Sequence, residues 1–176
     1  MLIRTLRLTL LILLVTPAAV FAQDNPPKSV KPQSEAKKAF NSLKTLTGSW
    51  QGTIMGISIN FTIRPASSGT AILHEGNTTA EGPPKQEITM FYLDGDRLLA
   101  THYCDGGNRS HFEGKMSPDG KTIELSFLEV VGSTRGGYLK GMVFTLIDAD
   151  QHTVEATFVM PDGKPIPLRG EFKRTK

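Results

Sequence analysis

The sequence predicts an all-β domain, an up-and-down antiparallel β-barrel of about ten strands that is preceded by one amphipathic helix. Three observations lead to this fold class. From Ser49 onward apolar and polar residues alternate, as in the stretch 57–64 (ISINFTIR). Turn sequences such as Asp94-Gly95 and Asp162-Gly163 separate the apolar runs. No helix-length segment lies between these runs, so consecutive strands must pair antiparallel.

Residues 1–22 have the features of a secretory signal peptide. Two arginines precede a short apolar stretch (residues 8–15), and small residues occupy the −3 and −1 positions of a cleavage site after Ala22. We therefore expect cleavage after Ala22 and a periplasmic or secreted protein, with no transmembrane segment in the mature chain. Residues 23–33 contain three prolines and almost no apolar residue, which predicts a disordered leader.

The remaining residues suit one domain, which we place at 34–176. The whole chain has 20 basic and 17 acidic residues and a formal net charge of +3. The predicted signal peptide carries two of the basic residues and none of the acidic ones, so the mature chain keeps 18 basic and 17 acidic residues and a charge of +1. This balance gives no support to nucleic-acid binding. The single cysteine cannot form an internal disulfide, so the core alone must hold the fold.

The first predicted element is a helix over residues 34–47. Ser34 is a suitable N-cap, and Gly48 is a suitable end. Apolar residues follow at helical spacing, namely Ala36, Ala39, Phe40, Leu43 and Leu46. One apolar face predicts that the helix lies on an apolar surface, flanking or closing one end of the barrel.

About ten strands follow, joined by short loops. Their approximate predicted spans are 50–55, 57–64, 70–78, 86–93, 97–104, 110–116, 122–131, 138–147, 152–160 and 166–174. Closing the sheet into a barrel removes the exposed edges of such a meander. A two-sheet sandwich is the alternative, but it needs longer connections between its sheets.

Two stretches resemble known families. Residues 46–52 (LTGSWQG) resemble the first strand of lipocalins, fatty-acid-binding proteins and nitrobindins, the calycin group, whose tryptophan packs over the closed end of the barrel. Residues 89–109 (TMFYLDGDRLLATHYCDGGNR) resemble a group of uncharacterised bacterial exported proteins with calycin-like barrels. This chain has Arg109-Ser110 where that group has Gln-Pro, and Gly137-Tyr138 where it often has Gly-His. The group has no established activity, so the resemblance implies a fold rather than a function.

The stretch from Thr101 to Asn108 (THYCDGGN) suggests a binding site. With Leu93 opposite Asp96 in the hairpin, alternation places Thr89, Phe91, Leu98, Ala100, His102 and Cys104 on one face. Such a mixture of apolar and polar groups is typical of the lining of a small-molecule cavity. The predicted ligand-binding residues are therefore His102, Cys104, Thr89 and Phe91, with Asn108 and Arg109 at the mouth.

The same stretch permits other interpretations. His102 and Cys104 could be purely structural, with Asn108 as a turn residue at positive φ. Nucleophilic catalysis is not favoured, because residues two apart on a strand are widely separated, and we assign no catalytic residue. Zinc could be held by His102 and Cys104 with Asp105 or His111, but the compact spacing of four ligands is absent, and we assign no metal ligand.

Haem is a further possibility that the resemblance raises, because nitrobindins hold haem through a histidine late in the barrel. The last predicted strand has no histidine, and we expect His152 at a turn or in solvent and His74 to be partly exposed. Tyr138 is the remaining candidate ligand, and we assign no cofactor.

The predicted function is binding of a small apolar or amphipathic ligand by an exported barrel. A metal- or haem-dependent enzyme on the same barrel is one alternative. A barrel with a filled core and a structural or protein-binding role is the other. Nothing in the sequence decides the oligomeric state.

Overall fold

The structure is a computed structural model, and it describes residues 33–78 and 85–175. The predicted signal peptide lies outside the described residues, as does the predicted leader apart from Gln33. Among the described helices, none has the length and apolar character needed to cross a bilayer.

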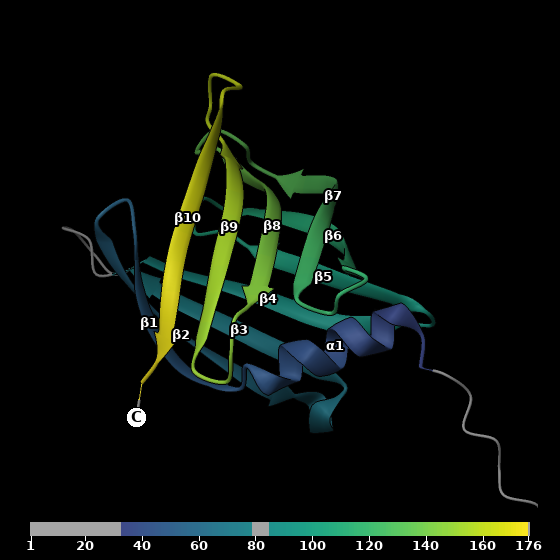
Figure 1. The fold of residues 1–176 in the computed structure, drawn as a ribbon. Coiled ribbons are helices and arrows are strands. Elements are labelled where there is room, and N and C mark those ends of the chain that lie inside the picture. Colours follow the sequence, from purple (N-terminus) through teal and green to yellow (C-terminus); the bar gives the residue numbers. More distant parts are fainter. Residues whose placement is uncertain (1–32, 79–84, 176) are drawn as a thin grey trace, which may run out of the picture. The chain divides into compact units, whose positions relative to one another are not determined.

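Ten strands form a single closed barrel (Figure 1). Each strand pairs antiparallel with its neighbours in sequence, and β1 also pairs with β10, which closes the sheet. The strands are β1 (Gly48–Ile54), β2 (Ile57–Ala66), β3 (Ala71–Thr78), β4 (Lys85–Asp94), β5 (Arg97–Tyr103), β6 (Asn108–Met116), β7 (Thr122–Gly132), β8 (Tyr138–Leu146), β9 (Gln151–Val159) and β10 (Pro165–Arg174). The predicted barrel is confirmed, and the sandwich is excluded because no edge is left unpaired.

The predicted register of the β4–β5 hairpin is wrong by two residues. Asp94 pairs with Arg97, and Thr89 pairs with His102. The turn therefore consists of Gly95 and Asp96 alone, and Gly95 has a positive φ of 57°, as a tight two-residue hairpin requires. A shift by two residues preserves alternation, so the predicted division of the strands into two faces is unaffected.

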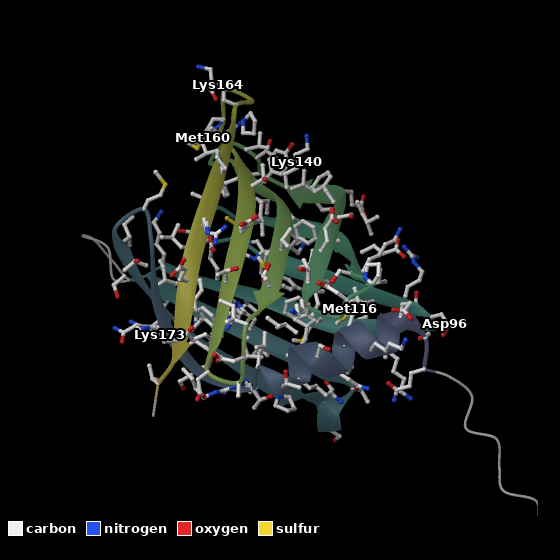
Figure 2. All side chains as sticks on the ribbon, viewed as in Figure 1. Asp96, Met116, Lys140, Met160, Lys164 and Lys173 are labelled. Atoms are coloured by element: carbon white, nitrogen blue, oxygen red, sulfur yellow. The ribbon has the colours of Figure 1, made fainter. Side chains whose placement is uncertain are left out.

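The helix α1 (Glu35–Thr45) closes one end of the barrel and leads into β1 (Figure 1). The Ser34 side chain caps it by accepting a hydrogen bond from the Lys37 amide at 3.3 Å. Its apolar face packs against β2, β4, β5 and β6. Figure 2 shows Asp96 and Met116, at strand ends, near this helix, whereas Met160 and Lys164 lie at the far end on the β9–β10 hairpin.

The core fills the half of the barrel next to α1. Large side chains from many strands are fully buried there, among them Trp50, Phe91, Phe112, Ile123, Leu125 and Phe144. The helix adds Phe40 and Leu43 to the same cluster. The predicted helix and strands thus enclose one continuous core, and the opposite half of the barrel remains for a site.

Arg174 ties the end of β10 to the start of the domain. Its guanidinium donates hydrogen bonds to the carbonyl oxygens of Thr45, Thr47 and Ala149. It also lies over the Trp50 ring, 4.3 Å from the ring centroid. The Arg174 side chain is only 25% exposed. It joins the end of α1 to the strand that closes the barrel.

We expect Arg174→Lys to lower the free energy of unfolding by about 1–2 kcal/mol. A lysine ammonium cannot reproduce the planar fork of donors that reaches these carbonyl oxygens. Urea denaturation measures the change. Arg169→Lys is the matched control, because Arg169 pairs with Glu155 on the exposed surface and should change stability by no more than about 0.5 kcal/mol. Equal effects of the two substitutions would contradict the role assigned to Arg174.

Candidate functional site

A cavity of about 540 Å³ lies inside the barrel, toward the end away from α1. Most of its lining is apolar, including Ile59, Phe61, Leu139, Met142, Val154, Ala156, Phe158, Leu168 and Phe172. Met55 in the β1–β2 turn and Ile57 at the start of β2 are 73% and 42% exposed and form an apolar rim. A wider hollow of about 720 Å³ lies along β7–β10, but it is more open and none of the buried polar residues line it. The barrel cavity is therefore the candidate site.

A row of polar side chains crosses four adjacent strands inside the barrel. His74 on β3 pairs with Thr89 on β4, Thr89 with His102 on β5, and His102 with Ser110 on β6. The first three line the cavity. The Thr89 hydroxyl oxygen lies 2.9 Å from His102 Nδ1, and both residues are buried. This hydrogen bond fixes the orientation of the imidazole and leaves Nε2 facing the mouth of the cavity.

Glu87 and Cys104 meet His102 at this mouth. Glu87 Oε2 lies 3.7 Å from His102 Nε2, which is too long for a direct hydrogen bond. Cys104 Sγ lies 3.6 Å from Glu87 Oε1, the distance of a weak S–H···O contact. The three possible ligand atoms lie within 4.8 Å of one another. We call this arrangement the Glu87–His102–Cys104 cluster.

Burial determines the protonation of the cluster. It lowers the pKa of His102 to about 4, so the imidazole is neutral at neutral pH. Burial, together with the neighbouring carboxylates of Glu87 and Asp105, raises the pKa of the Cys104 thiol to about 11. The pKa of the Glu87 carboxyl is raised by burial and by Asp105. A thiol that holds its proton at neutral pH is a poor nucleophile, which argues against Cys-His catalysis.

The structure brings some of the predicted site residues together and separates others. Thr89 and His102 line the cavity, and half-buried Cys104 lies just beyond the end of β5. Phe91 points inward but is fully buried in the core, where its ring meets Phe144 edge-on with a centroid distance of 5.9 Å. Phe91 is not among the cavity-lining residues.

The two residues predicted at the mouth have different positions. Asn108 is 1% exposed, and its side-chain amide donates to the carbonyl oxygens of Ser133 and Gly137 at 3.0 and 2.8 Å. It therefore fastens the β7–β8 connection, and Gly107, not Asn108, supplies the positive φ of the turn. Arg109 lies between two buried residues of β6 and is exposed on the outer face, so the structure does not bring it to the cavity.

Sequence reasoning missed Glu87 and did not place His74 at the cavity. Glu87 has the same parity as Thr89 on β4, and continuing the observed register places it opposite Cys104. Placing the turn at Gly95-Asp96, and not at Asp94-Gly95 as predicted, would have revealed this pairing. His74, expected to be partly exposed to solvent, is half-buried on the cavity wall, with its ring centroid 4.5 Å from that of Phe61.

The prediction for His152 is wrong. Its ring is 0% exposed and is surrounded by Trp50, Phe61, Phe144 and Phe172, with centroid distances of 4.2–6.3 Å. Within the part of the chain that the structure describes, neither ring nitrogen has a hydrogen-bond partner. Phe172 pairs with His152 across β9 and β10, so this ring faces the core. The cavity residues from β8, β9 and β10 include no histidine, so the late-strand haem ligand of nitrobindins has no counterpart among them.

The third zinc ligand considered from the sequence, Asp105 or His111, differs from the one in the structure. Asp105 forms an ion pair with Lys85 at 3.3 Å, and its Oδ1 lies 3.6 Å from Cys104 Sγ. His111 lies outside the barrel, where its Nδ1 is 3.3 Å from the Thr101 hydroxyl. Glu87 takes the third place beside His102 and Cys104.

Comparison with known proteins supports the fold. No protein-family model matches the chain, and no curated protein matches it. Among solved structures, Rv2717c from M. tuberculosis is similar with a TM-score of 0.58 and 16% sequence identity, over 78% of this chain and 98% of that one. The barrel mFAP2b bound to DFHBI has a TM-score of 0.42 and 14% identity, over 82% of this chain and 100% of that one. At 16% identity the similarity to Rv2717c shows a shared fold alone.

Proposed function

We propose that this protein is exported and binds a small amphipathic ligand inside its barrel. The observation that carries the proposal is the cavity of about 540 Å³, which lies within the range of roughly 300–1,000 Å³ typical of ligand sites. A mostly apolar wall with a few convergent polar groups is the usual composition of such a site. The features of residues 1–22 support export from the sequence alone.

The charges around the cavity favour a ligand with an uncharged polar group. Burial lowers the pKa of His74 to about 3 and that of His102 to about 4, so both imidazoles are neutral near pH 7. Lys85, the one cation among the described lining residues, is paired with Asp105. We therefore propose a ligand whose apolar body fills the cavity and whose hydroxyl or carbonyl group reaches Thr89 and His102.

Filling the cavity should strongly weaken the binding of an apolar probe. We expect N-phenyl-1-naphthylamine, a neutral fluorophore, to bind with one molecule per chain and increased emission. Ala156→Trp places a large side chain on the cavity wall and should weaken this binding at least about tenfold. Lys140→Trp is the control, because it adds the same side chain at an exposed position of β8 that does not line this cavity (Figure 2).

Equal binding by both variants would place the probe outside the barrel and contradict the proposal.

Mass spectrometry of native protein identifies the ligand class. A co-purifying amphipathic molecule that is present in the wild type and lost in Ala156→Trp is the expected result. Thermal melting of each variant confirms that the barrel is folded.

A further inference from the structure

We propose that the Glu87–His102–Cys104 cluster is a zinc-binding site at the mouth of the barrel cavity. The three side chains supply one oxygen, one nitrogen and one sulfur atom from β4, the end of β5 and the residue after it. Carboxylate, imidazole and thiolate are the three kinds of side-chain ligand that proteins use for Zn²⁺, and binding of the ion would release the Cys104 thiol proton to solvent. The site does not depend on the cavity holding an organic ligand.

Two of the three separations are close to those of a tetrahedral site, although each is measured to a different Glu87 oxygen, and all three ligand atoms lie within 4.8 Å of one another. With Zn–N, Zn–S and Zn–O bonds of about 2.0–2.3 Å, tetrahedral geometry separates nitrogen from oxygen by about 3.4 Å and oxygen from sulfur by about 3.6 Å. The corresponding separations here are 3.7 Å from His102 Nε2 to Glu87 Oε2 and 3.6 Å from Cys104 Sγ to Glu87 Oε1. The Glu87 side chain is 41% exposed, so it has the freedom to bring one oxygen onto an ion.

His102 is oriented for this role before any ion arrives. Its side chain is 6% exposed, and Nδ1 is hydrogen-bonded to the Thr89 hydroxyl at 2.9 Å. Nε2 points into the cluster, and among the residues that the structure describes it has no hydrogen bond there, because Glu87 is 3.7 Å away. A metal-binding histidine typically has its second ring nitrogen held by such a partner, which fixes the tautomer and the ring plane. Thr89 is therefore a positioning residue.

Three protein ligands leave one tetrahedral position for another donor. Structural zinc sites use four protein ligands, whereas sites with three hold water or a ligand in the fourth position. Glu87 and His102 both line the cavity, so the open position adjoins its interior. The proposed occupant of that position is water or the donor group of the bound molecule.

Cobalt titration tests the site directly. The protein, freed of any histidine tag and kept in a non-thiol reductant, is titrated with Co²⁺ alone and then with Zn²⁺ alone. We expect one Co²⁺ per chain, a thiolate-to-cobalt charge-transfer band in the near ultraviolet, and displacement of the band by Zn²⁺. Failure to bind either ion stoichiometrically would overturn the proposal.

Variants separate metal binding from a structural role. Cys104→Ser keeps a hydrogen-bonding side chain but should remove the charge-transfer band. Glu87→Gln and His102→Gln should each weaken Co²⁺ binding at least about tenfold, and Thr89→Val by about 10–100-fold, with recovery in Thr89→Ser. His111→Gln is the matched control, because this histidine faces outward on β6 and should leave binding unchanged.

Retention of the band in Cys104→Ser, or equal weakening by His111→Gln, would refute the assignment. Melting curves identify any variant that fails to fold. If one of the other variants does not fold, the loss of the charge-transfer band in a Cys104→Ser protein with unchanged melting decides the assignment. N-phenyl-1-naphthylamine binding is measured on Cys104→Ser as well. Unchanged probe binding together with lost metal binding would show that the barrel cavity and the metal site can be tested separately.

Discussion

Replacing Trp50 with alanine should lower the free energy of unfolding by about 3–5 kcal/mol, the range for removing a buried tryptophan from a core. Trp50 is 1% exposed, and its indole N–H donates to the Leu46 carbonyl oxygen at 2.8 Å. Its ring also meets the His152 ring at a centroid distance of 4.2 Å and lies under Arg174. The substitution would open a cavity and remove contacts between α1, β1, β9 and β10 together.

Urea denaturation of three variants measures this effect. Trp50→Phe keeps an aromatic ring but loses the N–H donor, and we expect it to cost about 1–2 kcal/mol. Ile147→Ala is the exposed control, since Ile147 is 56% exposed and its removal should cost no more than about 0.5 kcal/mol. A loss below about 1 kcal/mol in Trp50→Ala would show that the closed end of the barrel does not depend on this residue.

Acid should destabilise the barrel through His152, by up to about 3 kcal/mol. Burial and the nearby Arg174 charge lower the pKa of His152 to about 4 in the folded protein, from the ordinary value of 6.5. As the pH falls, the unfolded chain therefore takes up a proton before the folded chain does. The full stability is present above about pH 6.5, and it declines between about pH 6.5 and pH 4.

The substitution His152→Phe isolates this contribution. Because neither ring nitrogen is hydrogen-bonded within the described residues, an apolar ring should leave stability at pH 7.5 equal or slightly higher. Between pH 7.5 and pH 4.5 the wild type should lose about 2–3 kcal/mol more than the variant. His152→Leu, whose side chain is closer to histidine in volume, is measured beside it to separate the pH effect from packing.

Titrating groups that do not interact with His152 are common to both proteins and cancel in this comparison. His74 stays neutral between pH 7.5 and pH 4.5, because burial is the largest cause that lowers its pKa to about 3. His111→Gln, which replaces a histidine on the outer face, is measured as the control. An identical loss of stability in the wild type and in His152→Phe would show that the buried imidazole does not control the acid response.

Much of the fold could be predicted because it depends on local pattern. Alternation and turn residues located all ten strands within a few residues of their observed ends. Ser34 and the apolar spacing behind it located α1, which ends at Thr45 and not at residue 47. Short loops excluded crossovers, so the order of the strands followed.

The site was predicted only in part. Alternation correctly placed Thr89 and His102 inside the barrel, because side chains change face at every residue. The same rule placed Phe91 inside as well, but it could not distinguish the packed half of the barrel from the hollow half. The position of α1 decides this difference, since the helix fills one end only.

The sequence by itself determined the number, order and facing of the strands, because each of these follows from the period of side chains along an extended chain and from the length of its loops. Only the tertiary structure decided that Glu87 joins His102 and Cys104, and that His152 lies among aromatic rings. Distances between side chains on different strands depend on the hairpin register and on the curvature of the closed sheet. A shift of two residues leaves every face unchanged, but it replaces every cross-strand neighbour.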